Sequence, residues 1–163
     1  SLAGDKNSSA EQQKRFRKLL NDNFDVRLLG KWALGRHWRK ATKIERAEYL
    51  AQFEEFLIAT YSKRFRQLTT EKINVASATS RSSRLAIVHS RLIRESNKPV
   101  RIDWRVAYPR GKYKIVDIIV EGISMLQTQR SEFGSVIRQN GGKVSGLTAA
   151  LHDKTESLKK RRK

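Results

Sequence analysis

The stretch NFDVRLLGKWALGRHWRKAT, residues 23–42, is followed by an amphipathic run that continues to about residue 68. Together they place many large apolar side chains close together in a very basic chain: Leu28, Leu29, Trp32, Trp38, Phe53, Phe56, Leu57, Tyr61 and Phe65. Two helices that share one seam need fewer such side chains. The surplus indicates that these helices cap a core or line a cavity, and a cavity would imply a ligand.

Local signals divide this region into two helices. Asp25 is placed to cap a short helix, and Gly35 is placed to end it, since glycine adopts the left-handed conformation common after a helix. Thr42 and Glu45 have the spacing of a capping box, which predicts that a long helix follows. Apolar residues at spacings of three and four continue from residue 47 to residue 68.

The N-terminal residues predict one more helix. Ser9 and Gln12 have capping-box spacing, and an apolar stripe follows until Asn21-Asp22-Asn23 interrupts it. We therefore expect a remnant over residues 1–8, a single domain over 9–158 and a basic tail over 159–163.

The apolar period changes from about 3.6 to two after residue 70, which predicts strands over 72–78, 85–93, 100–108 and 113–120. The last of these is almost continuously apolar, which is typical of a central strand covered on both faces. A helix should begin at Glu121-Gly122 and break at Gly141-Gly142, before a weaker final helix. This order predicts an α+β fold, with helices packed over one face of a curved four-stranded antiparallel sheet that encloses an apolar cavity.

Composition limits the chemistry. The 163 residues contain no cysteine, which excludes a thiolate metal site, a cysteine nucleophile and a disulfide framework. The three histidines, His37, His89 and His152, lack the spacing of a metal-binding motif, so we expect no metal or cofactor. The formal net charge of +19 favours anionic partners, which include nucleic acids, lipid surfaces and acidic proteins.

Two alternative functions follow from these residues. Asp117 lies in apolar surroundings, and a carboxylate in a cavity can act as a base, as in cone-shaped isomerases and dehydratases. Asp103 is flanked by Arg101 and Arg105, so it is expected to pair with arginine on a polar face. A nucleic-acid-binding module is the other alternative, but only the charge supports it, and no specific nucleic acid is expected.

The segments VDIIVEGIS at 116–124 and QRSEF at 129–133, together with NFDVRLLGKWALGRHWRKAT and RAEYLAQFEEFLIATYSKRF, resemble the MlaC, or toluene-tolerance, family. The resemblance runs from about residue 12 to residue 151. Arg27 departs from the family pattern, which often has a small residue or proline there, and the charge is heavier than usual.

The resemblance implies a soluble periplasmic lipid carrier rather than an enzyme. Such a protein binds phospholipid acyl chains in a hydrophobic cavity and shuttles lipid between an inner-membrane ABC transporter complex and an outer-membrane lipoprotein complex. It implies that a signal peptide has been removed and that the protein makes transient contact with anionic membranes. Because related proteins occur in hopanoid-biosynthesis gene clusters, the lipid need not be an ordinary glycerophospholipid.

A carrier of this type needs a wall of large apolar side chains from both helices and strands. The residues expected to form the lipid-binding cavity are Val26, Leu29, Trp32, Ala33, Phe53, Leu57, Tyr61, Val88, Trp104, Val106, Val116, Ile118, Met125, Phe133 and Ile137. The alternation of the strands predicts which of these residues share a face, but it leaves open which face meets the lipid.

Overall fold

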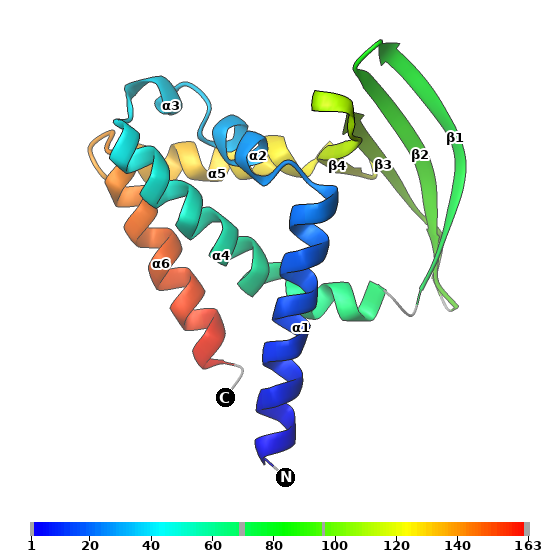
Figure 1. The fold of residues 1–163 in the computed structure, drawn as a ribbon, viewed down its shortest axis with the longest axis horizontal. Coiled ribbons are helices and arrows are strands. Elements are labelled where there is room, and N and C mark those ends of the chain that lie inside the picture. Colours follow the sequence, from blue (N-terminus) through cyan, green and yellow to red (C-terminus); the bar gives the residue numbers. More distant parts are fainter. Residues whose placement is uncertain (1, 69–70, 96, 162–163) are drawn as a thin grey trace.

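The structure is a computed structural model that describes residues 2–68, 71–95 and 97–161, with side chains described over 9–64, 71–95 and 97–161. Four helices come first, then a sheet, then two helices (Figure 1). The first helices are α1 (Leu2–Asn23), α2 (Val26–Leu34), α3 (His37–Lys40) and α4 (Lys43–Leu68). The strands are β1 (Lys72–Ser82), β2 (Leu85–Ile93), β3 (Val100–Ala107), β4 (Lys114–Val120) and β5 (Ile123–Ser124). A 3-10 turn η1 (Pro109–Gly111) joins β3 to β4, and the last helices are α5 (Met125–Gln139) and α6 (Val144–Lys160).

The α+β class with an antiparallel sheet is confirmed, but the sheet has five strands, in the order β1-β2-β3-β4-β5. The expectation that a helix begins at Glu121-Gly122 is wrong. Both residues have positive φ, 49° and 80°, so they turn the chain back on itself and let β5 pair with β4. The helix begins only at Met125, after the Ser124 hydroxyl accepts a hydrogen bond from the Gln127 N–H.

The strand β4 is not central, because β3 occupies the middle of the sheet. β4 is nevertheless covered on both faces at its midpoint, where the neighbouring residues Val116 and Asp117 are both buried. One of its edges pairs with β3. On the other edge, β5 pairs with its end, and Phe24 forms an isolated bridge with Ile115 at its beginning.

The predicted caps of α2 and α4 are confirmed. The Asp25 carboxylate accepts a hydrogen bond from the Leu28 N–H at 3.0 Å, and Gly35 ends α2 with a φ of 59°. Before α4, the Thr42 hydroxyl accepts from the Glu45 N–H while the Glu45 carboxylate accepts from the Thr42 N–H. The side chains of Phe65 and Leu68, which the helical stripe included, lie outside the described residues.

Both ends of the chain differ from expectation. The capping box at Ser9 and Gln12 does not start α1, because the helix already begins at Leu2. At the other end, Lys159 and Lys160 belong to the last turn of α6, and Arg161 caps it. The remainder of the basic tail, residues 162–163, lies outside the described residues.

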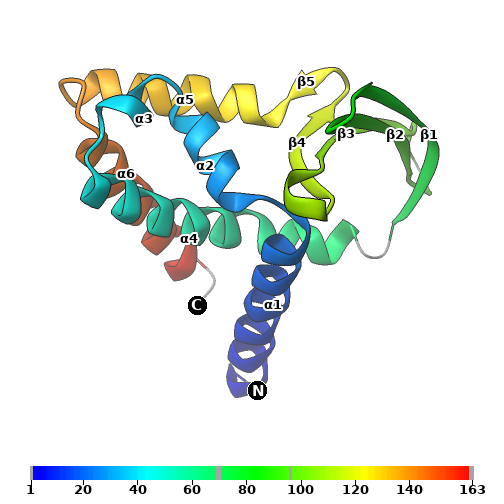
Figure 2. The ribbon, with the colours of Figure 1, turned by 45° about the horizontal axis from the view of Figure 1, so that its top comes forward.

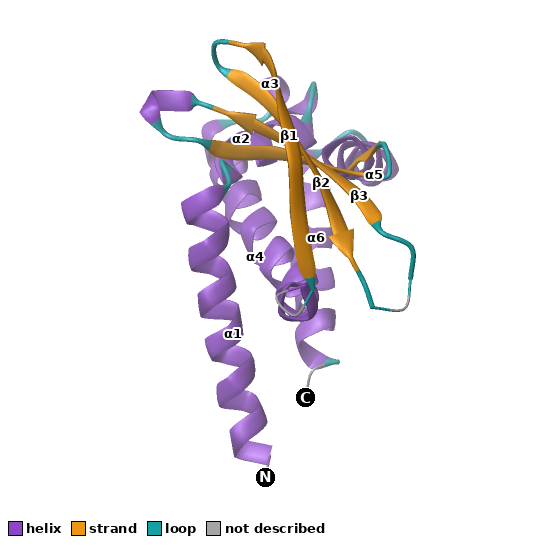
Figure 3. Ribbon diagram, turned by 90° about the vertical axis from the view of Figure 1, so that its right-hand side faces the viewer, coloured by secondary structure: helices purple, strands orange, loops and turns teal. Residues whose placement is uncertain are grey.

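The core of the helical half is packed by aromatic rings. Tyr49 and Phe53 stack, and Phe133 of α5 meets both of them edge-on, with ring centroids 6.3 and 6.1 Å away. The fully buried Tyr49 hydroxyl donates to the Gly30 carbonyl at 2.8 Å. The helices lie on one side of the sheet (Figure 3), and they pack most closely against its β4–β5 end.

Candidate binding site

One face of the sheet is apolar from one edge to the other. In register across the three middle strands, Val88 lies opposite Trp104, and Trp104 lies opposite Ile118. Because side chains alternate along a strand, the residues two positions away share this face. By this register the apolar sheet face comprises Ile73, Val75, Ala78, Ala86, Val88, Leu92, Val100, Ile102, Trp104, Val106, Ile115, Ile118, Val120 and Ile123, with Ser80 and Ser90 among them.

Ser90 does not make this face hydrophilic. Its buried hydroxyl donates to the Ile102 carbonyl at 2.7 Å and accepts from the Trp104 indole N–H at 2.8 Å. Both polar groups are therefore satisfied within the sheet, and the remaining Trp104 surface is apolar. The ends of the face are open: Val75 is 67% exposed and Ile123 is 60% exposed.

The opposite face carries the charged residues of the sheet. Asp103 is buried and accepts from Arg101 at 2.6 Å and from the His89 ring at 3.0 Å. Burial opposes ionisation of this carboxyl, but the hydrogen bonds from Arg101 and His89 outweigh it, so the pKa of Asp103 is lowered. The expected pairing of Asp103 with Arg101 is confirmed, although Arg105 lies toward Asp117 instead, with a shortest separation of 4.0 Å.

Asp117, the candidate catalytic base, is hydrogen-bonded to the start of α5. One carboxylate oxygen accepts from the Ser124 hydroxyl, and the other accepts from the Leu126 N–H at 3.0 Å. Asp117 therefore ties β4 to the first turn of α5, where an acidic group also complements the helix dipole. This arrangement uses both carboxylate oxygens in hydrogen bonds within the fold.

The structure separates the predicted lipid-binding residues into groups. Four of those from the strands share the apolar sheet face: Val88, Trp104, Val106 and Ile118. Val116 is buried at a register shift of β4, where it has no cross-strand partner. Several from the helices belong to the main helical core: Ala33, Phe53, Phe133 and Ile137, with Leu29 packed against them. Val26 and Leu57 also border this core, and with Tyr61 they pack against the smaller cluster of Phe16, Leu20 and Ile58. Trp32 and Met125 are each 37% exposed.

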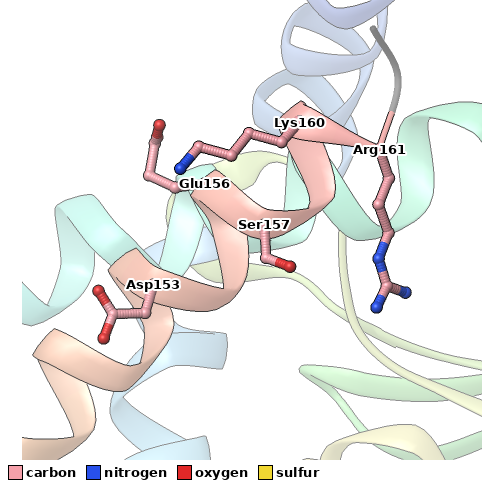
Figure 4. Close-up of a pocket in the computed structure, with 5 residues that line it drawn as sticks. All are labelled: Asp153, Glu156, Ser157, Lys160 and Arg161. Carbon is pink, nitrogen blue, oxygen red and sulfur yellow. The ribbon is translucent and has the colours of Figure 1, made fainter.

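Two open hollows mark the surface. The first, which we call the α2 hollow, has a volume of about 720 Å³ and lies between Leu28 and Trp32 of α2 and the ends of β2 and β3. In Figure 2, α2 and the β3–β4 connection lie side by side. The second, which we call the α6 hollow, has a volume of about 520 Å³ and is lined by α6 and its cap Arg161; Figure 4 shows its mostly charged side chains. The α6 hollow contains none of the predicted lipid-binding residues.

Sequence reasoning missed several residues of these surfaces. Ile73, Val75 and Ile123 extend the apolar sheet face to its edges. The alternation at 73 and 75 was a usable signal, whereas β5 is too short to have one. Tyr108 and Arg110 line the α2 hollow, and the complete lack of acidic residues over 104–116 was the signal there.

Among the described residues, no group of His, Asp and Glu side chains could hold a metal ion. A search of the same residues finds no helix with the length and apolarity needed to cross a membrane.

These features define an α+β protein in which helices with their own core lie beside an open sheet that has one apolar face. The family model described as MlaC protein matches residues 2–153, so the chain belongs to the MlaC family. Its fold is similar to that of the phospholipid-binding protein from Ralstonia solanacearum, solved in complex with a phospholipid. The two chains are 23% identical, with a TM-score of 0.79 over 95% of this chain and 88% of the other.

Proposed function

We propose that this protein is a non-enzymatic lipid carrier that holds the acyl chains of a phospholipid or related membrane lipid against the apolar sheet face. The observation that carries the proposal is that this face is continuous across five strands, yet the two hydrophobic clusters of the described residues contain helix and loop side chains and none from the strands. Leu92 and Ile102 of this face are buried, but Val88, Trp104 and Ile118 are only half-buried and Val75 and Ile123 are exposed. An apolar face that stays this accessible is typical of a binding surface. The phospholipid bound by the Ralstonia protein of similar fold supports the same interpretation.

The size of the hydrophobic effect explains why a lipid needs a sheltered face rather than a surface patch. Burying one methylene group is worth about 0.8 kcal/mol, so two long acyl chains represent about 20 kcal/mol. Only a space closed on several sides removes that much surface from water. The curved sheet and the helices beside it can provide the walls, with the headgroup outside.

Family membership supports a more specific role. We propose that the carrier works in the periplasm and moves lipid between an inner-membrane ABC transporter complex and an outer-membrane lipoprotein complex. Residues 9–158 would act as a single lipid-binding domain. Because each lipid contact is transient, the carrier must release its cargo as well as bind it.

The test compares two neighbouring residues of β2 that point to opposite faces. Val88 lies opposite Trp104 on the apolar sheet face, whereas Ile87 lies opposite Arg105 on the charged face, and both are half-buried. Placing an amide against acyl chains costs about 1–3 kcal/mol. Val88→Asn should therefore reduce the lipid recovered with the purified protein by about fivefold or more, while the control Ile87→Asn should retain it.

Native mass spectrometry after gentle purification measures the occupancy, and lipid extraction identifies the cargo. A wild-type protein that never contains lipid and takes none from vesicles would contradict the proposal. Equal lipid loss in both variants would contradict the assignment of the binding site to the apolar sheet face.

A further inference from the structure

Three segments that are separate in the sequence contain no acidic residue, and parts of all three meet at one hollow. Residues 26–44, 79–88 and 104–116 contain twelve lysines and arginines and no aspartate or glutamate. Leu28 and Trp32 of the first segment, Arg84 of the second and Arg110 of the third meet around the α2 hollow. We call the exposed cationic and aromatic side chains of these three segments the basic face; Ala86, Val88, Trp104 and Val106, which lie on the apolar sheet face, are not part of it. Ten of the twelve cationic residues are exposed.

The basic face also carries the exposed aromatic side chains of the described residues. Trp32 is 37% exposed, Tyr108 is 41% exposed and Tyr113 is 74% exposed. The Tyr108 and Tyr113 rings pack together with centroids 4.7 Å apart, beside the α2 hollow that Tyr108 lines. Arg110, at the turn between them, has a φ of 53° and is exposed.

Tryptophan and tyrosine prefer the headgroup level of a bilayer, where an apolar ring and a polar group can both be accommodated. Lysine and arginine near an anionic bilayer each contribute about a fivefold gain in binding before screening by salt. An acidic protein partner would satisfy the charge as well, and the test below therefore includes it as an outcome that contradicts the proposal. The combination of cationic and amphipathic aromatic side chains therefore matches an anionic bilayer surface.

We propose that the basic face is the surface on which this protein docks on anionic bilayers, with Trp32, Tyr108 and Tyr113 entering the headgroup region and Arg84, Arg110 and Lys112 contacting lipid phosphates. This inference rests on the proposed carrier function, because a carrier must reach a membrane to exchange its cargo. The docking surface is distinct from the apolar sheet face: its aromatic rings come from α2 and the β3–β4 connection.

The test uses vesicles of phosphatidylcholine alone and of phosphatidylcholine with phosphatidylglycerol. The variant Arg84→Gln/Arg110→Gln/Lys112→Gln should weaken co-sedimentation with the anionic vesicles at least about tenfold at physiological salt. The control Lys63→Gln/Arg64→Gln/Lys154→Gln removes the same charge from exposed positions on α4 and α6, and it should bind nearly as well as the wild type. If both variants lose binding equally, only net charge matters and the proposed surface is wrong.

Brominated phosphatidylglycerol provides a positional readout. It should quench the fluorescence of Trp32, so Trp32→Phe should remove most of the quenching seen in the wild type. Quenching that is unchanged in Trp32→Phe would overturn the placement of α2 at the bilayer. Wild-type protein that binds an acidic protein but not anionic vesicles would likewise overturn the choice of partner.

Lipid occupancy of the same preparations separates this inference from the carrier proposal. The Arg84→Gln/Arg110→Gln/Lys112→Gln variant should keep its cargo, since none of its changes lies on the apolar sheet face. Vesicle binding by a wild-type protein that never carries lipid would remove the carrier function and leave the docking surface intact.

Discussion

The helical half and the sheet of this protein differ in how deeply they bury their aromatic side chains. In the helical half, Tyr49, Phe53 and Phe133 pack ring against ring in a buried core. In the sheet, Trp104 is only half-buried, and its indole N–H is bonded to Ser90 within the sheet. The buried aromatic core thus lies in the helical half, while much of the apolar sheet face stays accessible.

The largest expected effect tests where the stability lies. Phe133→Ala removes a ring that is 3% exposed from the helical core and should cost about 3–5 kcal/mol of unfolding free energy. Trp104→Ala, on the half-buried sheet face, should cost roughly half of that or less in lipid-free protein. Urea unfolding of both delipidated variants measures the difference, and equal losses would contradict the division between the two halves.

The next effect concerns the tie between the two halves. Asp117→Asn keeps the shape of the side chain, but an amide cannot accept both the Ser124 hydroxyl and the Leu126 N–H as the carboxylate does. We expect a loss of about 1–3 kcal/mol in thermal or urea unfolding, without loss of lipid binding. The control Asp153→Asn changes an exposed carboxylate on α6 and should be nearly neutral. A catalytic turnover that Asp117→Asn abolished in a stable protein would restore the enzyme alternative.

The smallest effect is a pH dependence that belongs to the sheet. The pKa of Asp103 is lowered in the folded protein, since the hydrogen bonds from Arg101 and His89 outweigh burial. Its stabilising contribution is therefore complete above the unfolded value of about 3.9 and is lost as pH falls through the lower folded value. Arg101 is exposed, so solvent screening keeps this contribution small. Unfolding measured from pH 5 to pH 2 should be less pH-dependent in Asp103→Asn than in the wild type, and identical profiles would contradict the assignment.

The sequence predicted the parts of the fold that depend on local chemistry. The Asp25 cap, the Gly35 end and the Thr42–Glu45 box concern neighbouring residues only, and all three are confirmed. The two-residue strand β5 was missed because it is too short to show a period, and its turn at Glu121-Gly122 resembles a helix start. The beginning of α1 at Leu2 was missed because the spacing of Ser9 and Gln12 alone does not prevent a helix from passing through them.

The candidate site was predictable in part for a similar reason. Strand alternation placed Val88, Trp104 and Ile118 on one face, as the register confirms. Whether each predicted residue contacts lipid stays a prediction. The α2 hollow could not be predicted, because Trp32, Arg84 and Arg110 come from three distant segments whose meeting depends on how the sheet sits against α2.

The attachment of the sheet has a mechanical consequence. Three ties join β4 to the helical half: the Asp25 N–H donates to the Ile115 carbonyl, the Lys114 ammonium donates to two carbonyls at the end of α1, and Asp117 accepts from the start of α5. β1 lies at the far edge of the sheet, with every residue exposed. Among the described residues, the sheet is thus attached to the helical half through β4, whereas β1 at the opposite edge pairs with β2 alone. A movement of β1 and β2 relative to the helices would therefore leave the aromatic core of the helical half unchanged, because none of the core rings comes from the sheet.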